Sequence, residues 1–216
     1  MVVDPSSDVY FPSLAKLKYQ SLLSNPMIVS LDEKASTCPI SLTNPSTEGL
    51  YSAVILLVTE AFKDQKDKGG YPYLGHLLYV STIAGKWAKV LLPAVTEKQV
   101  EFVKVIGLLH DLYEDQPQYK QRLKDLLSSH LTELDVATIE YSLDCLTKRQ
   151  GEQYSAYLER VQSDRFATVV KIADCQHNSI IERLPAEIRT DVAIQRCLKY
   201  NNRAERLKKF LLQQKI

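Results

Sequence analysis

The sequence has little of what would indicate a membrane protein, a disulfide scaffold or a nucleic-acid surface. Its 27 basic and 26 acidic residues give a formal net charge of +1, so no strong field favours nucleic acid or an anionic membrane. The longest apolar run near the N-terminus, residues 53–58, is far too short to span a bilayer. The four cysteines show neither zinc-knuckle spacing nor a disulfide framework: Cys38, Cys145, Cys175 and Cys197.

The first residues also lack the basic segment and apolar core of a signal peptide. We therefore expect a protein of the reducing cytoplasm, with no nucleic-acid or membrane partner. The oligomeric state is left open.

Glycine and proline are unevenly distributed over the 216 residues. Residues 1–48 hold five of the nine prolines and none of the seven glycines. This segment reads as an irregular N-terminal arm with one short helix at 13–23, whereas residues 49–216 form a single domain.

The period of apolar residues after residue 49 is helical, and few stretches alternate with period two. The sequence therefore predicts an all-α fold. Cap residues and proline breaks place its helices at 50–65, 74–91, 97–115, 132–147, 154–161, 164–184 and 187–213.

The expected helix at 97–115 ends in polar side chains. It begins with Thr96 as a candidate N-cap, and its apolar face finishes at His110. His110 and Glu114 are four residues apart, as are Asp111 and Asp115, so each pair lies about 5–6 Å apart at Cβ. These nitrogen and oxygen ligands suit a divalent cation and leave a spare base, although a solvated helix end would read the same.

Two further segments carry candidate ligands. His76 opens the expected helix at 74–91, and Asp174 lies among apolar residues at 169–175. A carboxylate in such surroundings needs a partner, which is either a cation or an ordinary cap or ion-pair contact.

The order of these residues resembles the HD-domain metal-dependent phosphohydrolases. Within them the details resemble the RelA/SpoT-type alarmone hydrolases, including the small stand-alone forms. The similar strings cover residues 68–76, 108–115, 146–149 and 171–178, with a weaker match on the final helix at Tyr200. The resemblance implies one all-α HD-domain helical bundle.

The resemblance also implies roles for individual residues. Four match the ligands of one cation, usually manganese, with another divalent transition metal as the alternative: His76, His110, Asp111 and Asp174. Two match the catalytic acidic pair that activates and orients the attacking water: Glu114 and Asp115. Five match positions that contact or lie near the substrate: Lys68, Thr147, Lys148, Asn178 and Tyr200.

The sequence departs from the family pattern at two positions. Asp67 stands where the long relatives usually have a guanine-contacting Arg, and Leu77 stands where Pro usually follows the first ligand. We therefore expect weak discrimination between guanine and adenine. Of the two remaining histidines, we expect His130 at the surface and His177 in a supporting or structural role. Four histidines are too few for a dinuclear HD phosphodiesterase.

These observations predict hydrolysis of the 3′-pyrophosphate of a (p)ppGpp-like nucleotide, which gives the parent nucleotide and pyrophosphate. One alternative is an HD-class 5′-nucleotidase or nucleoside triphosphate hydrolase. Another is a non-catalytic module that senses nucleotides. Asp115 and the 68–73 loop favour the alarmone reading, and Glu114 argues against a sensor because binding alone has no need of a base.

Overall fold

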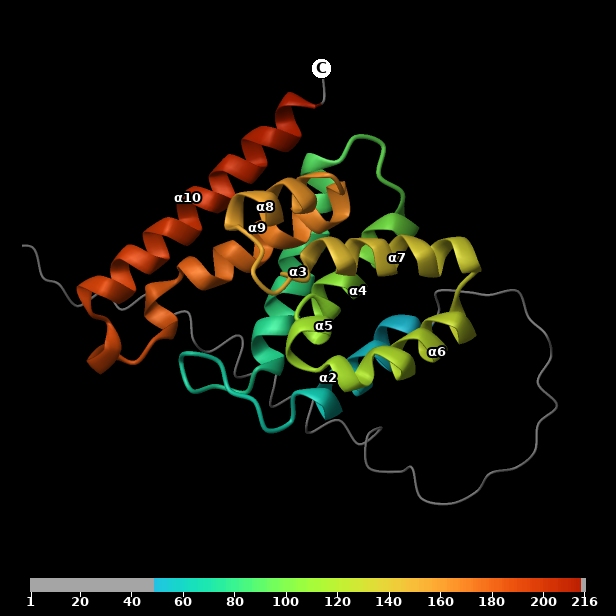
Figure 1. Cartoon of the computed structure of the whole chain (residues 1–216), viewed down its shortest axis with the longest axis horizontal. Helices are drawn as coiled ribbons and strands as arrows, with labels where there is room; N and C mark the ends of the chain where they lie inside the picture. Colours follow the sequence, from blue (N-terminus) through green and yellow to red (C-terminus); the bar gives the residue numbers. More distant parts are fainter. Residues whose placement is uncertain (1–48, 215–216) are drawn as a thin grey trace, which may run out of the picture. The chain divides into compact units, whose positions relative to one another are not determined.

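The structure is a computed structural model, and it describes residues 49–214 (Figure 1). The expected N-terminal arm at 1–48, with its helix at 13–23, lies outside the described residues. The α-helices are α2 (Leu50–Ala61), α3 (Leu74–Leu91), α4 (Glu97–Leu109), α5 (Leu112–Asp115), α6 (Lys120–His130), α7 (Glu133–Leu146), α8 (Tyr154–Gln162), α9 (Arg165–Ser179) and α10 (Asp191–Gln213). Short 3-10 turns connect some of them: η2 (Pro117–Tyr119), η3 (Ile181–Arg183) and η4 (Ala186–Ile188).

The all-α prediction is confirmed for this part of the chain. Between residues 49 and 214 there is no strand, and the only β-type pairing is an isolated antiparallel bridge between Lys66 and Pro72. None of the helices in the same range is both long enough and apolar enough to cross a membrane.

Capping side chains explain where several helices begin. Thr96 accepts a hydrogen bond from the Gln99 amide, and the Gln99 side chain accepts one from the Thr96 amide, which completes a capping box at α4. Thr132 caps α7 through the Asp135 amide, as the sequence predicts. Asp164 caps α9 by accepting hydrogen bonds from two amides of its first turn.

Three predicted helix ends are wrong. Helix α2 ends at Ala61 rather than 65, and α9 ends at Ser179 rather than 184. Leu184 precedes Pro185 and is extended, because a residue before proline avoids the α region, but the chain has already left α9 at Ile180, which is extended too. The last helix begins at Asp191 rather than 187, with Thr190 as its N-cap.

The expected helix at 97–115 is interrupted. Helix α4 ends at Leu109, and α5 starts at Leu112 after a turn at His110 and Asp111. Because Asp115 N–H still donates to the Asp111 carbonyl (2.9 Å), the four-residue spacing of the acidic side chains is kept across this turn.

The core centres on α3, which packs most extensively against α4 and α9 (Figure 1). Gly107 lets α3 and α4 approach closely, since a Cβ there would lie 2.7 Å from the Ser81 Cα. Leu77, Leu108 and Ile172 are fully buried between these helices. This packing brings the first turn of α3, the last residues of α4 and the middle of α9 together.

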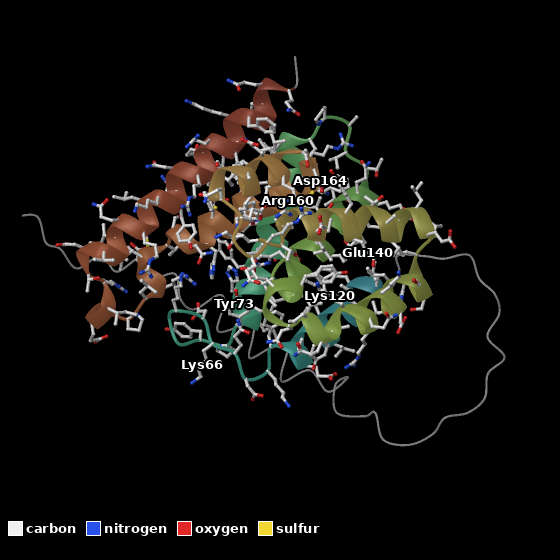
Figure 2. The ribbon with its side chains drawn as sticks, in the orientation of Figure 1. Lys66, Tyr73, Lys120, Glu140, Arg160 and Asp164 are labelled. Carbon is white, nitrogen blue, oxygen red and sulfur yellow. The ribbon has the colours of Figure 1, made fainter. Side chains whose placement is uncertain are left out.

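A loop at 62–73 joins α2 to α3. Lys66 lies at its outer edge, and Tyr73 lies on the side that faces the helices (Figure 2). The Tyr73 ring stacks on Phe62 with centroids 5.2 Å apart, which holds the end of the loop against the core.

Candidate functional site

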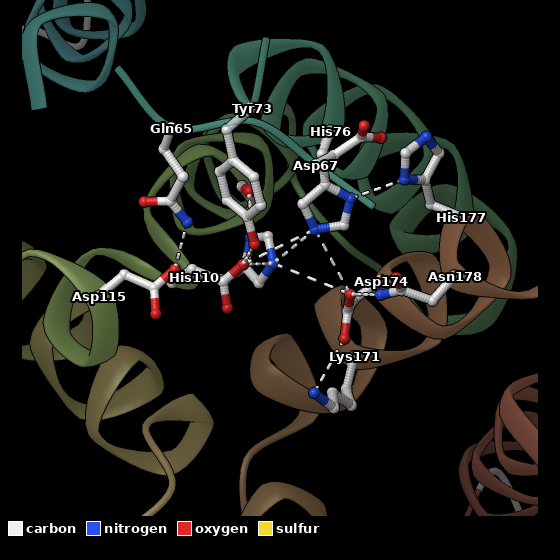
Figure 3. Close-up of polar contacts among 12 residues, drawn as sticks. Gln65, Asp67, Tyr73, His76, His110, Asp115, Lys171, Asp174, His177 and Asn178 are labelled. Atoms are coloured by element: carbon white, nitrogen blue, oxygen red, sulfur yellow. Dashed lines mark hydrogen bonds and ion pairs between the residues drawn. The ribbon is translucent and has the colours of Figure 1, made fainter. Parts of the chain in front are cut away.

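Four predicted ligand atoms converge where α3, α4 and α9 meet (Figure 3). The Nε2 atoms of His76 and His110 are 3.3 Å apart. Asp111 Oδ2 lies 2.8 Å from His110 Nε2 and 3.7 Å from His76 Nε2. Asp174 Oδ1 lies 3.5 Å from His76 Nε2 and 3.9 Å from His110 Nε2. Two imidazoles and two carboxylates thus share one small volume.

Three of these residues meet a stricter spacing. One ligand atom from each of His76, His110 and Asp111 lies within 4.8 Å of the others, a group able to hold a metal ion. His76 and His110 are buried, with 5% and 3% of their surface exposed. Since neutral imidazole and carboxylate suit divalent transition metals, the donor set fits such an ion.

The backbone of α4 orients His110. Its Nδ1 donates to the Gly107 carbonyl at 2.9 Å, so Nε2 is the atom that faces the other ligands. Burial lowers the pKa of His110, but Asp111 and Asp174 outweigh burial and raise it to about 9. A cation at Nε2 has to displace this proton, so its affinity rises as pH rises toward that value.

A second histidine orients His76. The Nδ1 atoms of His76 and His177 are 2.6 Å apart, and the two rings lie with centroids 4.8 Å apart. Burial, then the charges of His76 and Arg183, lower the pKa of His177 to about 3, so this ring is neutral and its Nδ1 can accept a hydrogen bond from His76. His130 lies elsewhere, on the last turn of α6, where its Nδ1 lies 3.0 Å from the Leu126 carbonyl.

Tyr73 holds Asp111. Its hydroxyl donates to Asp111 Oδ2 at 2.5 Å. Burial, followed by the charge of Asp111, raises the pKa of Tyr73, so the phenol stays a donor. Burial alone would raise the pKa of Asp111, but His110 and His76 hold it well below its usual value, so the carboxylate is ionised.

Two other side chains of α9 contact the Asp174 carboxylate. Lys171 Nζ lies 2.9 Å from Asp174 Oδ2, one helical turn away. Asn178 Nδ2 donates to Asp174 Oδ1 at 2.5 Å (Figure 3). Each oxygen of this buried carboxylate therefore has a donor, which compensates for the loss of water.

The predicted catalytic pair lies on α5 and is exposed. Glu114 Oε2 accepts a hydrogen bond from the Lys148 amide at 3.1 Å. Asp115 Oδ2 accepts one from the Gln65 side chain at 2.8 Å (Figure 3). Both carboxylates are exposed and keep acceptor capacity for further hydrogen bonds, three and four residues along the chain from Asp111.

The residues that the sequence predicts to contact the substrate differ in their exposure and in their contacts with the protein. Lys68 is exposed, but desolvation and the charges of Arg196 and Arg183 lower its pKa, and Asp174 is also within electrostatic range. Thr147 uses its hydroxyl on the Leu143 carbonyl, and Lys148 contacts Glu114 through its backbone. The Tyr200 ring lies 5.4 Å from the Arg203 guanidinium, on α10.

Asp67 does not present its carboxylate to solvent. Its side chain is 8% exposed and accepts a 2.9 Å hydrogen bond from Arg183. Its other oxygen accepts hydrogen bonds from the amides of Gly69 and Tyr71. The departure at this position therefore serves the shape of the loop.

Several contacting residues escape the sequence pattern. Tyr73, Lys171 and Arg196 lie in or near the recognised strings, but nothing in their spacing assigns them a partner. Arg183 was expected inside a regular helix, where it would not turn back toward the loop. The positions of Lys171 and Asp174, three apart on one helix, are the one signal that could have revealed a pair.

Comparison with known proteins agrees with this geometry. The family model described as HD domain matches residues 73–194. The match spans more than half of the chain and includes all four converging residues. No curated protein matches the chain.

Proposed function

The chain belongs to the HD domain family of metal-dependent phosphohydrolases, and we propose that it hydrolyses the 3′-pyrophosphate of a (p)ppGpp-like nucleotide. The products would be the parent nucleotide and pyrophosphate. One Mn²⁺ per chain, or another divalent transition metal, would be the cofactor. The supporting observation is the convergence of His76, His110, Asp111 and Asp174 beside the exposed Glu114, Asp115 and Lys68.

The donor set supports the metal assignment. The Nε2 atoms of the two imidazoles lie 3.3 Å apart, with an oxygen of Asp111 2.8 Å from one of them and an oxygen of Asp174 3.5 Å from the other. Histidine and carboxylate ligands that leave positions open for water and substrate suit hydrolysis. When bound, the ion would acidify a water molecule and offset charge on the leaving pyrophosphate.

The chain's own residues supply the remaining chemistry. Glu114 would accept the proton of the attacking water, and the Lys148 amide holds its carboxylate in place. Asp115, held by Gln65, would orient that water. Lys68 would bind a phosphate of the substrate as a point charge, with Arg196 close enough to lower the pKa of its ammonium.

Two other functions would use the same fold. A 5′-nucleotidase or triphosphohydrolase of the HD class would need the same metal ligands, and a nucleotide sensor would need only a pocket. Asp115 and the Lys68 loop favour the 3′-pyrophosphate substrate, and an exposed Glu114 beside the ligands favours catalysis over sensing.

One experiment separates the three functions. Metal content is measured on the purified full chain, and products are then identified from a panel of ppGpp, nucleoside triphosphates and nucleoside monophosphates. GDP and pyrophosphate from ppGpp alone would support the proposal. Phosphate from a monophosphate, or cleavage of a triphosphate, would support the nucleotidase or triphosphohydrolase. Binding without turnover would support the sensor.

A further inference from the structure

Arg183 makes two hydrogen bonds that lead in different directions. One nitrogen of its guanidinium donates to Asp67 Oδ2 at 2.9 Å, and another donates to Asn178 Oδ1 at 2.8 Å. The Arg183 and Asp67 side chains are only 12% and 8% exposed. This pair is therefore too buried to count as an ordinary surface ion pair, and its geometry is well defined.

The Asp67 contact fixes the loop that carries Lys68. One Asp67 oxygen faces Arg183, and the other accepts hydrogen bonds from Gly69 N–H (2.8 Å) and Tyr71 N–H (3.0 Å). Gly69 also lies so close to the Arg183 carbonyl that a side chain there would collide with it. The loop is thus held on residue 183 through both a side chain and the backbone.

The Asn178 contact fixes a metal ligand. A guanidinium can only donate, so the amide oxygen of Asn178 has to face Arg183 and its NH₂ has to face Asp174. That NH₂ donates to Asp174 Oδ1, the same oxygen that lies 3.5 Å from His76 Nε2. Arg183 therefore selects the amide orientation that holds this oxygen beside the two imidazoles.

We propose that Arg183 is a positioning residue that couples the 66–72 loop to the metal centre, so that loop order and cation affinity support each other. The coupling path is Asp67, Arg183, Asn178 and Asp174, and every step is a hydrogen bond. Thermodynamic linkage makes this coupling reciprocal. A change that disorders the 66–72 loop lowers the affinity for the cation, and a bound cation orders the loop. The proposal rests on the metal site of the proposed function, but not on its substrate.

The decisive variant is Arg183→Met, assayed with Mn²⁺ alone on metal-stripped full chain by titration calorimetry. Removing a positive charge near a cation site should tighten binding if only charge matters. The coupling instead predicts that the Mn²⁺ dissociation constant rises by about threefold to thirtyfold. Arg183→Lys keeps the charge but loses the fork, and is expected to weaken binding as well. Unchanged or tighter binding in Arg183→Met would overturn the proposal.

A variant at the far end tests the path itself. Asp67→Asn touches no proposed ligand, yet it should weaken Mn²⁺ binding in the wild-type background and have little further effect in Arg183→Met. Glu152→Gln is the matched control. The Arg160–Glu152 pair is equally buried, at 15% and 12%, but has no contact with a ligand. Equal losses of affinity in Asp67→Asn and Glu152→Gln would mean general destabilisation and overturn the coupling.

Hydrogen exchange gives a readout that does not depend on activity. In the wild type, Mn²⁺ should slow exchange of the Gly69 and Tyr71 amides, and in Arg183→Met this slowing should be lost while saturating Mn²⁺ is still bound. An equal slowing in both proteins would contradict the proposal. A wild type that binds Mn²⁺ and shows this coupling but leaves ppGpp intact would overturn the substrate assignment alone. A wild type that binds no Mn²⁺ would overturn the metal site and the coupling together.

Discussion

The two halves of the site differ in how firmly the fold holds them. On the ligand side, His76, His110 and Asp174 are buried, and each has a protein partner on the atom or oxygen that faces away from the centre. On the acidic side, Glu114 and Asp115 are exposed on the four-residue helix α5, and each accepts a hydrogen bond from a residue outside that helix.

This difference in burial matches the two roles that we propose, metal binding for the buried residues and proton transfer for the exposed ones. A ligand set has to be held in place before the ion arrives, because each misplaced ligand reduces metal affinity. A base that meets water and substrate has to remain accessible. The ligand half should therefore respond to substitution in metal affinity and stability, whereas the acidic half should respond in turnover.

The largest effect is expected from removing a ligand. Purified protein should carry about one transition-metal ion per chain, and both His76→Ala and Asp174→Ala should lose it. Metal content after gel filtration checks this, with Asp125→Ala on the exposed face of α6 as the control. Full occupancy in both ligand variants would refute the assignment.

The same pair of variants distinguishes two causes of instability. Asp174→Ala also strips the Lys171 ammonium of its partner, and breaking a buried ion pair costs about 3–5 kcal/mol. Without metal, Asp174→Ala should therefore unfold at a lower denaturant concentration than His76→Ala. Equal midpoints would show that Lys171 reaches solvent easily.

The second effect lies in the acidic half. Glu114→Gln should keep the metal and the fold but lower kcat by about 10²–10⁴-fold, since an amide cannot accept the proton of water. Steady-state kinetics on ppGpp with metal content measured in parallel is the test, and Glu133→Gln on α7 is the control. If kcat decreases by less than about tenfold, proton transfer to this residue does not contribute much to the rate.

The third effect returns to the ligand half. For His76 to bind metal through Nε2, its Nδ1 has to keep its proton and donate a hydrogen bond to His177 Nδ1. His177→Phe keeps a ring but removes the acceptor, so we expect about 10–100-fold weaker Mn²⁺ binding. His177→Asn restores an acceptor near the same position and should recover much of that affinity. If both variants bind like the wild type, His177 is a packing residue.

The sequence predicted best what depends on local chemistry. Thr96 and Thr132 begin helices because their side chains accept hydrogen bonds three residues ahead, a pattern visible in a short window. The end of α9 is not visible in such a window, because the chain turns at Ile180 toward a contact between Arg183 and Asp67 that lies far away in the sequence.

Local sequence patterns cannot predict the contacts that support the candidate ligands, because these contacts join residues far apart in the chain. His177 meets His76 across 101 residues of chain, and Arg183 meets Asp67 across 116. No periodicity encodes such pairs, because they exist only after α3 and α9 pack together. The resemblance to a family supplied the order of ligands and the position of Asn178, but it did not supply the contacts of Tyr73, Lys171 and Arg183 that hold those ligands.

The smallest expected effect concerns the base. An Arg can stack on a purine and donate hydrogen bonds to its edge, but Asp67 can do neither, and its carboxylate is turned toward Arg183 and two loop amides. Lys68 offers a point charge that holds a phosphate without reading a base. We therefore expect the guanine and adenine 3′-pyrophosphates to be hydrolysed with kcat/KM values within about tenfold, a difference of about 1.4 kcal/mol.

Two variants sharpen this last expectation. Lys68→Ala should lower kcat/KM for both nucleotides by the same factor, because both present the same phosphates. Asp67→Arg is a poor test, since it would place a second guanidinium against Arg183 and disturb the loop. A hundredfold preference for guanine in the wild type would mean that another side chain reads the base. Unequal losses in Lys68→Ala would then point to Lys68, because a residue that holds only phosphate cannot distinguish two bases.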